Sequence, residues 1–512
     1  MKNLKKLVAL TLAMLMLLVG CGQTANNDSE GGDNELTTVT VMMWDRGHEY
    51  TNGKTVTNNL YTDWLNELME PQGVHLEFIA VSRSSSDDQI NMLLAGGEAP
   101  DIVRTYARQR VAAYAQQGGL VDFNKYLDKL DASYLRDAKD VLKYGQFEGG
   151  QYALIGLQEY WGKQHETYIR QDLVEGMGMQ LPTTKQELID VLYAMKEHYP
   201  DITPWMFSGT IDNEHFNNWL LSYTTHKNLR DKYIYEGSWT MALKPGTKDG
   251  LKVLNQLWLD GIINEDFMLD TDMSKFEQAA ANGQIGFIME GSANGIDAYE
   301  TVTDPNYHMI EIDCIEDVDG SYAVPSQDAF SHYIYVPKAS EGKIDAIIKF
   351  LNLLGNEETA LDCYYGKEGL GYEWVDGLPI GYDRAEKLEK GTHGQQQDVG
   401  GFMRTSFPIE KETILERYII NHPDVPEDVC EGKVKSQYSN YYDKELVGAA
   451  LPSDQYVSLV DNMIVELVYK CIAAPEGQFD AVYEAEYQRL LDNHLQEILD
   501  ERAAWYDANI AK

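Results

Sequence analysis

The hydrophobic pattern of the chain after residue 36 switches between the period of a strand and the period of a helix. Residues 37–44 carry an apolar side chain at every second position and are predicted to form a strand. Apolar residues at helical spacing follow up to Pro71, and residues 74–78 then alternate as a second strand. Another helix leads to a third strand that starts at Ile102. This order of elements predicts a mostly parallel sheet with helices on both faces.

Two helix starts can be predicted from capping residues. Ser86 and Gln89 fit a capping box in front of a helix over residues 87–94. Thr184 is placed to cap a later helix, while Glu187 reaches back to its first turn. The alternation of helical and strand patterns continues through the rest of the chain and ends in a helical C-terminal tail. An α/β fold is therefore expected throughout.

The first twenty residues have the pattern of a secretory signal peptide. Three lysines precede an apolar run over residues 7–18, which is too short to span a bilayer as a helix. The run ends in Leu-Val-Gly-Cys, which resembles a bacterial lipobox with cleavage before Cys21 and a lipid on its sulfur. The alternative is an ordinary signal peptide followed by a chance cysteine. Residues 21–36 are rich in Gly, Asp and Glu and are predicted to be a disordered tether. We therefore expect an exported protein that is anchored to the outer face of the cell membrane.

Composition and motifs exclude several classes of partner and cofactor. A formal net charge of −40 argues against nucleic acid and against a long polyanion as the general partner, although it leaves room for a local basic pocket. The alternative is that the acidity only keeps the protein soluble. No HExxH, CxxC, Walker or complete dinucleotide motif occurs, so we expect neither a metal nor a cofactor. The four cysteines after Cys21 are expected to be mostly buried thiols, and the alternative is one disulfide between two of them.

A dense group of Arg and Tyr residues follows the third predicted strand. Arg104, Tyr106, Arg108 and Arg110 lie within seven residues, just before the next helix. Ligands of open α/β sheets bind where strands end, so this stretch is the first candidate for a ligand-binding loop. The alternative is that one or two of these arginines form ion pairs with neighbouring acids and never meet a ligand.

Longer motifs cover most of the chain in a characteristic order. They include GGEAPDIV, YAQQGGL, TYIRQDLVEGMGMQLPTTKQELIDVL, NQLWLDGIINEDF, ANGQIGFIMEG, IIKFLNLLGNEETALDCYYGKEGLGYEW and FDAVYEAEYQRLLDNHLQEI. Together with the lipobox, they resemble the extracellular solute-binding lipoproteins of ABC importers. The resemblance is to the carbohydrate-binding group that includes maltose-binding protein.

The resemblance implies the two-lobed periplasmic-binding-protein fold of type II. Each lobe would be a mostly parallel sheet flanked by helices, with a strand hinge between the lobes and extra helices at the C-terminus. The first lobe would comprise residues 37–165 and 331–378, and the second lobe residues 166–330 and 379–512. A sugar would be enclosed in the cleft between the lobes by hinge closure.

The resemblance also places ligand-binding residues at the exits of the first and third strands. These are Trp44, Asp45, Arg46 and His48, and then Arg104, Thr105, Tyr106 and Arg108. The acid that maltose-binding protein carries in the third-strand turn is missing here. Asn294 lies where the second lobe of the family has an aromatic residue, so stacking is expected from elsewhere. The calcium loop of some long relatives is also absent, which again predicts no metal site.

Other tryptophans and polar residues are candidates because sugar sites pair flat rings with polar groups. The candidate rings are Trp161, Trp205, Trp219 and Trp374, and the candidate polar groups are Gln327 and Asp328. The alternative for Trp219, which precedes two leucines, is a place in the hydrophobic core.

The function implied by the resemblance is capture of an oligosaccharide and its delivery to the permease subunits of an ABC importer. The protein would be a monomer tied to the membrane through Cys21, and it would not be an enzyme. One alternative is a surface glycoside hydrolase or lyase, which needs two carboxylates facing one bond. Another is a binding protein that presents its sugar to a receptor kinase.

Overall fold

The computed structural model describes most of the chain. It describes residues 36–47, 50–131, 142–147, 149–157, 166–209, 215–225, 227–235, 239–271, 273–290, 299, 302, 304–320, 322, 330–395, 398, 411–437 and 451–511. Residues 37–512 form one compact unit. Within the described part of the chain, no helix is long and apolar enough to cross a membrane, and no group of three or more metal-binding side chains occurs.

The first sheet is built around β1 (Thr37–Asp45). It pairs in parallel with β2 (Val74–Ser82), and a bridge between Val41 and Ile102 joins it to β3 (Val103–Thr105). β3 pairs antiparallel with β11 (Phe330–Tyr335), which pairs antiparallel with β6 (Leu154–Leu157). The three strands predicted from the hydrophobic pattern are confirmed.

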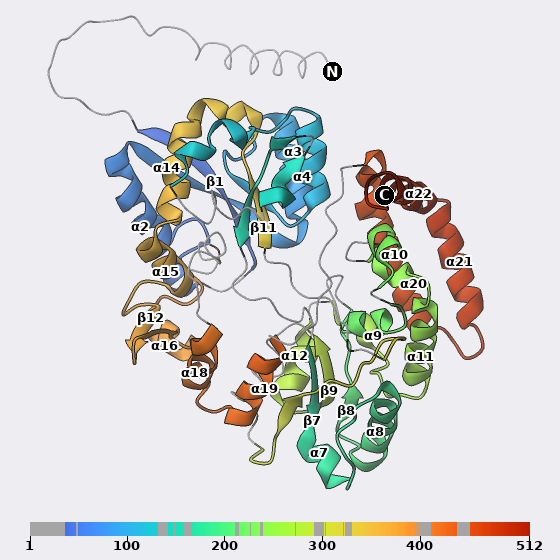
Figure 1. The fold of residues 1–512 in the computed structure, drawn as a ribbon. Coiled ribbons are helices and arrows are strands. Elements are labelled where there is room, and N and C mark those ends of the chain that lie inside the picture. The colour runs from blue at the N-terminus through green and yellow to red at the C-terminus, as the bar shows by residue number, and fades with distance from the viewer. Residues whose placement is uncertain are drawn as a thin grey trace, which may run out of the picture. The chain divides into compact units, whose positions relative to one another are not determined.

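Helices cover both faces of this sheet (Figure 1). Val39, Val41 and Met43 point to a core that includes residues of α2 (Leu60–Met69) and α14 (Ile344–Leu354). Met42 and Trp44 point to the opposite core, which is shared with α3 (Ser86–Gly96) and α4 (Arg108–Gln116). Since side chains of a strand alternate between faces, the single sequence of β1 supplies both cores.

The second sheet has the strand order β10-β7-β9-β8. These strands are β10 (Met309–Glu311), β7 (Glu166–Arg170), β9 (Ile285–Glu290) and β8 (Thr203–Trp205). The core on one face includes residues of α8 (Lys185–His198), α11 (Thr247–Leu259) and α20 (Val457–Ile472). Helices α21 (Phe479–Leu491) and α22 (Leu495–Asn509) also contribute to this core, so the predicted C-terminal helices are confirmed.

Shorter elements complete the fold. The other α-helices in the described part of the chain are α7 (Gln171–Gly176), α9 (Asn217–Leu221), α10 (Leu229–Ile234), α12 (Ser274–Ala281), α15 (Glu357–Tyr365), α16 (Arg384–Glu389), α18 (Lys411–Asn421) and α19 (Glu427–Gln437). Two hairpins are formed by β4 (Gln146–Phe147) with β5 (Gly150–Gln151), and by β12 (Tyr372–Val375) with β13 (Leu378–Gly381).

Two details differ from the sequence-based expectation. The sheets are mixed rather than mostly parallel, because β11 runs antiparallel to both of its neighbours and β7 does the same in the second sheet. The cap of α3 also differs, because Ser86 is a buried residue inside the helix and Ser85 precedes it. The cap of α8 is confirmed at Thr184, although Glu187 accepts its hydrogen bonds from Thr183.

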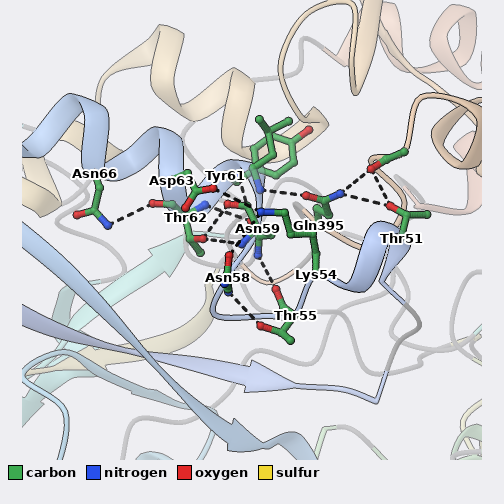
Figure 2. Close-up of polar contacts among 12 residues, drawn as sticks. Thr51, Lys54, Thr55, Asn58, Asn59, Tyr61, Thr62, Asp63, Asn66 and Gln395 are labelled. Atoms are coloured by element: carbon green, nitrogen blue, oxygen red, sulfur yellow. Dashed lines mark hydrogen bonds and ion pairs between the residues drawn. The ribbon is translucent and has the colours of Figure 1, made fainter.

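The start of α2 is fixed by a buried network of amide and hydroxyl groups (Figure 2). Asn59 caps the helix, since its Oδ1 accepts from the backbone N–H groups of Tyr61 and Thr62 at 2.9 and 3.1 Å. The Oε1 of Gln395 accepts from the N–H of Leu60 at 3.0 Å. Gln395 is therefore hydrogen-bonded to the first turn of α2, although 335 positions separate it from Leu60 in the sequence.

The four cysteines after Cys21 are free and buried. Burial raises the pKa of the Cys471 thiol to about 12, and it also raises the pKa of Cys363. Both thiols therefore stay protonated at neutral pH, and the structure contains no disulfide among these four residues.

A buried carboxyl group on α20 makes stability depend on pH. The Oδ1 atom of Asp461 is buried and has no hydrogen-bond partner among the described residues. Burial raises the pKa of Asp461 from 3.8 to about 6, and the charge of Arg502 opposes this rise. The folded protein therefore holds a proton here that the unfolded chain releases, so this group lowers stability as the pH rises from about 4 to 6.

We expect Asp461→Asn to stabilise the protein by about 2 kcal/mol at pH 7, because the substitution removes a charge that is costly to bury. The gain should disappear below pH 4, where the aspartate is protonated in both states. Urea unfolding at several pH values between 4 and 7 measures the effect. Asp500→Asn, on the exposed face of α22, is the control and should change little. A gain that does not vary with pH would contradict the assignment.

Candidate functional site

The register of the first sheet brings four chain segments to one edge. The pairs Trp44 with Val81 and Asp45 with Ser82 lie at the ends of β1 and β2, and Thr105, the last residue of β3, pairs with Tyr333 inside β11. Arg46 and Arg83 therefore leave β1 and β2 side by side, since parallel strands in register end at the same edge. Tyr106 leaves β3 at this edge, and His332 lies on β11 beside it.

Aromatic rings form the centre of this edge. The rings of Trp44 and Tyr106 are stacked, with centroids 5.1 Å apart and an interplanar angle of 12°. The ring of His332 contacts both rings edge-on, at 6.2 and 6.1 Å. Tyr106 is 42% exposed, whereas Trp44 is only 1% exposed. The buried indole is therefore a rigid base that holds the phenol ring in place at the surface.

Three guanidinium groups surround the stacked rings. The Cζ atom of Arg104 lies 4.1 Å from the centroid of the Trp44 ring, and that of Arg46 lies 5.5 Å from it. The Cζ atom of Arg83 lies 4.8 Å from the Trp44 centroid and 4.9 Å from the Tyr106 centroid. These are cation–π distances, so each cation is attracted to the ring faces.

One carboxylate from a remote segment enters the cluster. Asp398 accepts a hydrogen bond from the backbone N–H of Trp44 at 2.6 Å, and its side chain forms a buried ion pair with Arg104. The Nε of Arg46 lies 3.6 Å from its other oxygen. Burial lowers the pKa of Arg104, and the charge of Asp398 opposes that shift. Gln395, three residues before Asp398, accepts a hydrogen bond from the first turn of α2, and this contact helps to hold Asp398 in place.

The remaining predicted residues of the third-strand loop have structural contacts. Thr105 is buried, and its hydroxyl donates to Asp87 at 2.8 Å. The guanidinium of Arg108 lies 4.7 Å from the ring centroid of Phe147. Asp101, which precedes the loop, accepts from the N–H of Thr40 at 2.8 Å and ties β3 to β1.

The predicted tryptophans divide into buried and exposed rings. Trp205 and Trp219 are completely buried in the core of the second sheet, with their ring centroids 5.6 Å apart. Trp374 is 47% exposed on the β12–β13 hairpin. The other predicted positions, which are Cys21, His48, Trp161, Asn294, Gln327 and Asp328, lie outside the described residues.

The sequence-based prediction missed Arg83, His332 and Asp398. Arg83 directly follows β2 as Arg46 directly follows β1, but the strand predicted from the sequence ended at residue 78 and so did not point to Arg83. His332 belongs to a strand that returns to the first sheet from much later in the chain. Asp398 has no local signal, since its partner Arg104 is 294 positions away.

Comparison with known proteins places this geometry in a family. The bacterial extracellular solute-binding protein family matches residues 64–372, which is more than half of the chain. The chain belongs to this family. The resemblance predicted from the motifs is therefore confirmed, and the members of the family are binding proteins rather than enzymes.

Individual relatives of this solute-binding protein have low sequence identity to it, but the matches cover most of each chain. It is 23% identical over 405 residues to lipoprotein LipO of Bacillus subtilis, with 75% of this chain and 76% of LipO covered. It is 21% identical over 384 residues to the polygalacturonan/rhamnogalacturonan-binding protein YtcQ of the same organism, with 72% and 73% covered.

A solved structure shows the same two-lobed fold. An HMO-binding, ABC-transporter-associated solute-binding protein from Bifidobacterium longum infantis superposes with a TM-score of 0.64 at 18% identity. The match covers 92% of this chain and 99% of that one. The predicted two-lobed α/β architecture is thus confirmed for this solute-binding protein.

Proposed function

We propose that this protein captures an oligosaccharide outside the cell and delivers it to the permease of an ABC importer. The observation that supports the proposal is the exposed ring of Tyr106, stacked on buried Trp44 and surrounded by guanidinium groups. A flat ring offers a face for the apolar side of a sugar, and guanidinium groups offer donors for its hydroxyl oxygens.

The buried residues of the cluster take a supporting role in this proposal. Trp44 and Arg104 are 1% exposed, so they would act through Tyr106 and Asp398, whereas Arg46 and Arg83 would contact the ligand. Asp45, His48 and Arg108 remain proposed neighbours of the sugar. Trp161, near the end of the first segment of lobe 1, and Asn294, Gln327 and Asp328 on the second lobe remain proposed contacts, and closure of the lobes would enclose the ligand. We do not include Trp205 and Trp219 among the ligand contacts, since both rings are completely buried in the core.

Delivery and location are part of the same proposal. Two similar proteins have names that state binding of polygalacturonan/rhamnogalacturonan and of HMO, and the second is associated with an ABC transporter. The similarity to lipoprotein LipO supports a lipid anchor, which we place at Cys21. Binding energy would be used to bias the open and closed forms, because only a ligand with different contacts in the two forms shifts their balance.

The test is a titration of the purified protein with a panel of oligosaccharides, followed by calorimetry and Trp fluorescence. We expect Tyr106→Ala to weaken binding of the active sugar about tenfold or more, because the stacking face is lost, while Tyr106→Phe keeps it. Tyr193→Ala, which removes an exposed tyrosine of α8, is the control. An unchanged affinity of Tyr106→Ala would contradict the assigned surface, and heat and fluorescence both silent across the panel would contradict the function.

A further inference from the structure

The cluster at the edge of the first sheet has more positive than negative charge. Arg46 and Arg104 share one carboxylate, that of Asp398. Arg83 has no acidic side chain within 4.0 Å among the residues that the structure describes, and it is held there by the two rings alone. In these four side chains, three guanidinium groups therefore face a single carboxylate.

Nearby acids are engaged elsewhere. Asp87 accepts from Thr105 and lies 3.9 Å from Arg110, and Asp88 lies 3.4 Å from Arg110. Asp45 is exposed and accepts from the backbone N–H of Gly47 at 2.9 Å. Arg110 is thus balanced by two carboxylates, whereas Arg83 is not balanced by any of them.

Unused hydrogen-bond donors lie at the same place. The Nε of Arg83 and the Nε1 of Trp44 are buried and have no hydrogen-bond partner among the described residues. A buried donor without a partner is costly. Because Trp44 is 1% exposed, it is the partly buried Arg83 that a ligand with an acceptor can contact. The guanidinium of Arg46 is accessible as well, since its side chain is 29% exposed.

We propose that the saccharide bound beside Tyr106 carries a carboxylate, and that Arg83 together with Arg46 binds this group. The inference rests on the proposed function and specifies the class of sugar. A planar guanidinium matches a carboxylate in a two-bond fork, which makes this pair stronger and more selective than contacts with neutral hydroxyl groups. Uronate-containing oligosaccharides, with an apolar ring face and one carboxylate per residue, fit both halves of the surface.

The acidity of the whole protein does not oppose this inference. The formal charge is −40, but exposed charges are screened over about 8–10 Å at physiological ionic strength. The groups within ring contact of Trp44 and Tyr106 therefore set the potential that a bound sugar meets. Selection between charged and neutral sugars would take place at Arg83.

The experiment compares acidic oligosaccharides with their methyl esters, which keep the ring and the linkage but lose the charge. The probes are oligogalacturonate, alginate oligomers and sialyllactose, each with its methyl ester, and they separate uronates from terminal sialates. An oligosaccharide whose only charged group is a sulfate tests for a general anion site. Titration by calorimetry with the purified full chain gives the affinities. We expect an acid form to bind at least tenfold tighter than its ester.

Variants locate the effect. Arg83→Gln should lower the affinity for the acid at least tenfold and leave the ester within about twofold, and Arg83→Lys should recover only part of the loss because it lacks the fork. Arg110→Gln is the matched control, since it removes an arginine of the neighbouring helix that is already paired. Thermal unfolding of each variant verifies that it is folded.

Each outcome decides the inference. Tighter binding of an acid, lost in Arg83→Gln, supports it. Equal binding of acid and ester, binding of neutral or sulfated sugars alone, or an unchanged Arg83→Gln would overturn it while leaving the proposed function intact. The absence of binding to every sugar would instead overturn the proposed function and this inference with it.

Discussion

Asp398→Ala is expected to lower the free energy of unfolding by about 3 kcal/mol, because the substitution leaves the buried guanidinium of Arg104 without its carboxylate. The two side chains are 0% and 2% exposed, so water cannot replace the lost partner. The backbone N–H of Trp44 also loses its acceptor, which was 2.6 Å away. Urea unfolding measures the change, and Trp fluorescence is a suitable probe because Trp44 lies in the cluster.

A surface ion pair in the same part of the protein provides the control for Asp398. Asp63 lies 3.6 Å from Lys54, and the two side chains are 63% and 35% exposed. Asp63→Ala should therefore cost less than about 1 kcal/mol. If Asp398→Ala cost no more than this control, the ion pair with Arg104 would not be a structural element of the cluster.

The second large effect concerns the core of the other sheet. We expect Trp205→Ala to lower the free energy of unfolding by about 4 kcal/mol, since it opens a large cavity in a closely packed region. The Trp205 ring contacts the rings of Phe207, Trp219 and Phe287 edge-on, at 5.2, 5.6 and 5.1 Å. The same urea unfolding experiment measures this loss.

Trp374→Ala is the matched control for Trp205→Ala, since it removes the same side chain from an exposed hairpin. Trp374 is 47% exposed, so its removal should change stability by less than about 1 kcal/mol. Comparison of the two variants also distinguishes core packing from ligand contact, the two roles that the sequence left open for a tryptophan. A stable Trp205→Ala variant with weakened sugar binding would place Trp205 in the ligand site and contradict its place in the core.

The parts of the fold that could be predicted are those with local signals. The alternation in β1 identified both the strand and the face that carries Val39, Val41 and Met43. The rule that ligands bind beyond strand ends selected the loop with Arg104 and Tyr106, and the resemblance to the family added Trp44 and Arg46. The direction of β11 could not be read in this way. A strand that joins a sheet after a long excursion pairs according to tertiary packing, and its own pattern does not record the pairing direction.

The site was harder to predict than the fold, for physical reasons. A tryptophan in the sequence has the same apolar ring whether it is core or surface, and only the packing distinguishes Trp205 from Trp374. Arg104 was expected to contact the ligand, but it lies 1% exposed beneath the rings because Asp398 neutralises it from a remote segment. Tyr106 lies at the surface where β3 ends, and its contact with a ligand stays a prediction.

The origin of Asp398 has a consequence for how specificity is inherited. The match to the family covers residues 64–372, a range that includes Arg83, Arg104 and Tyr106. Trp44 and Asp398, which support and neutralise those groups, lie outside that region. A match over this range does not by itself establish which side chains another member carries at the positions of Trp44 and Asp398. Grouping such proteins by ligand will need the first strand and the residues around 398, and not the family core alone.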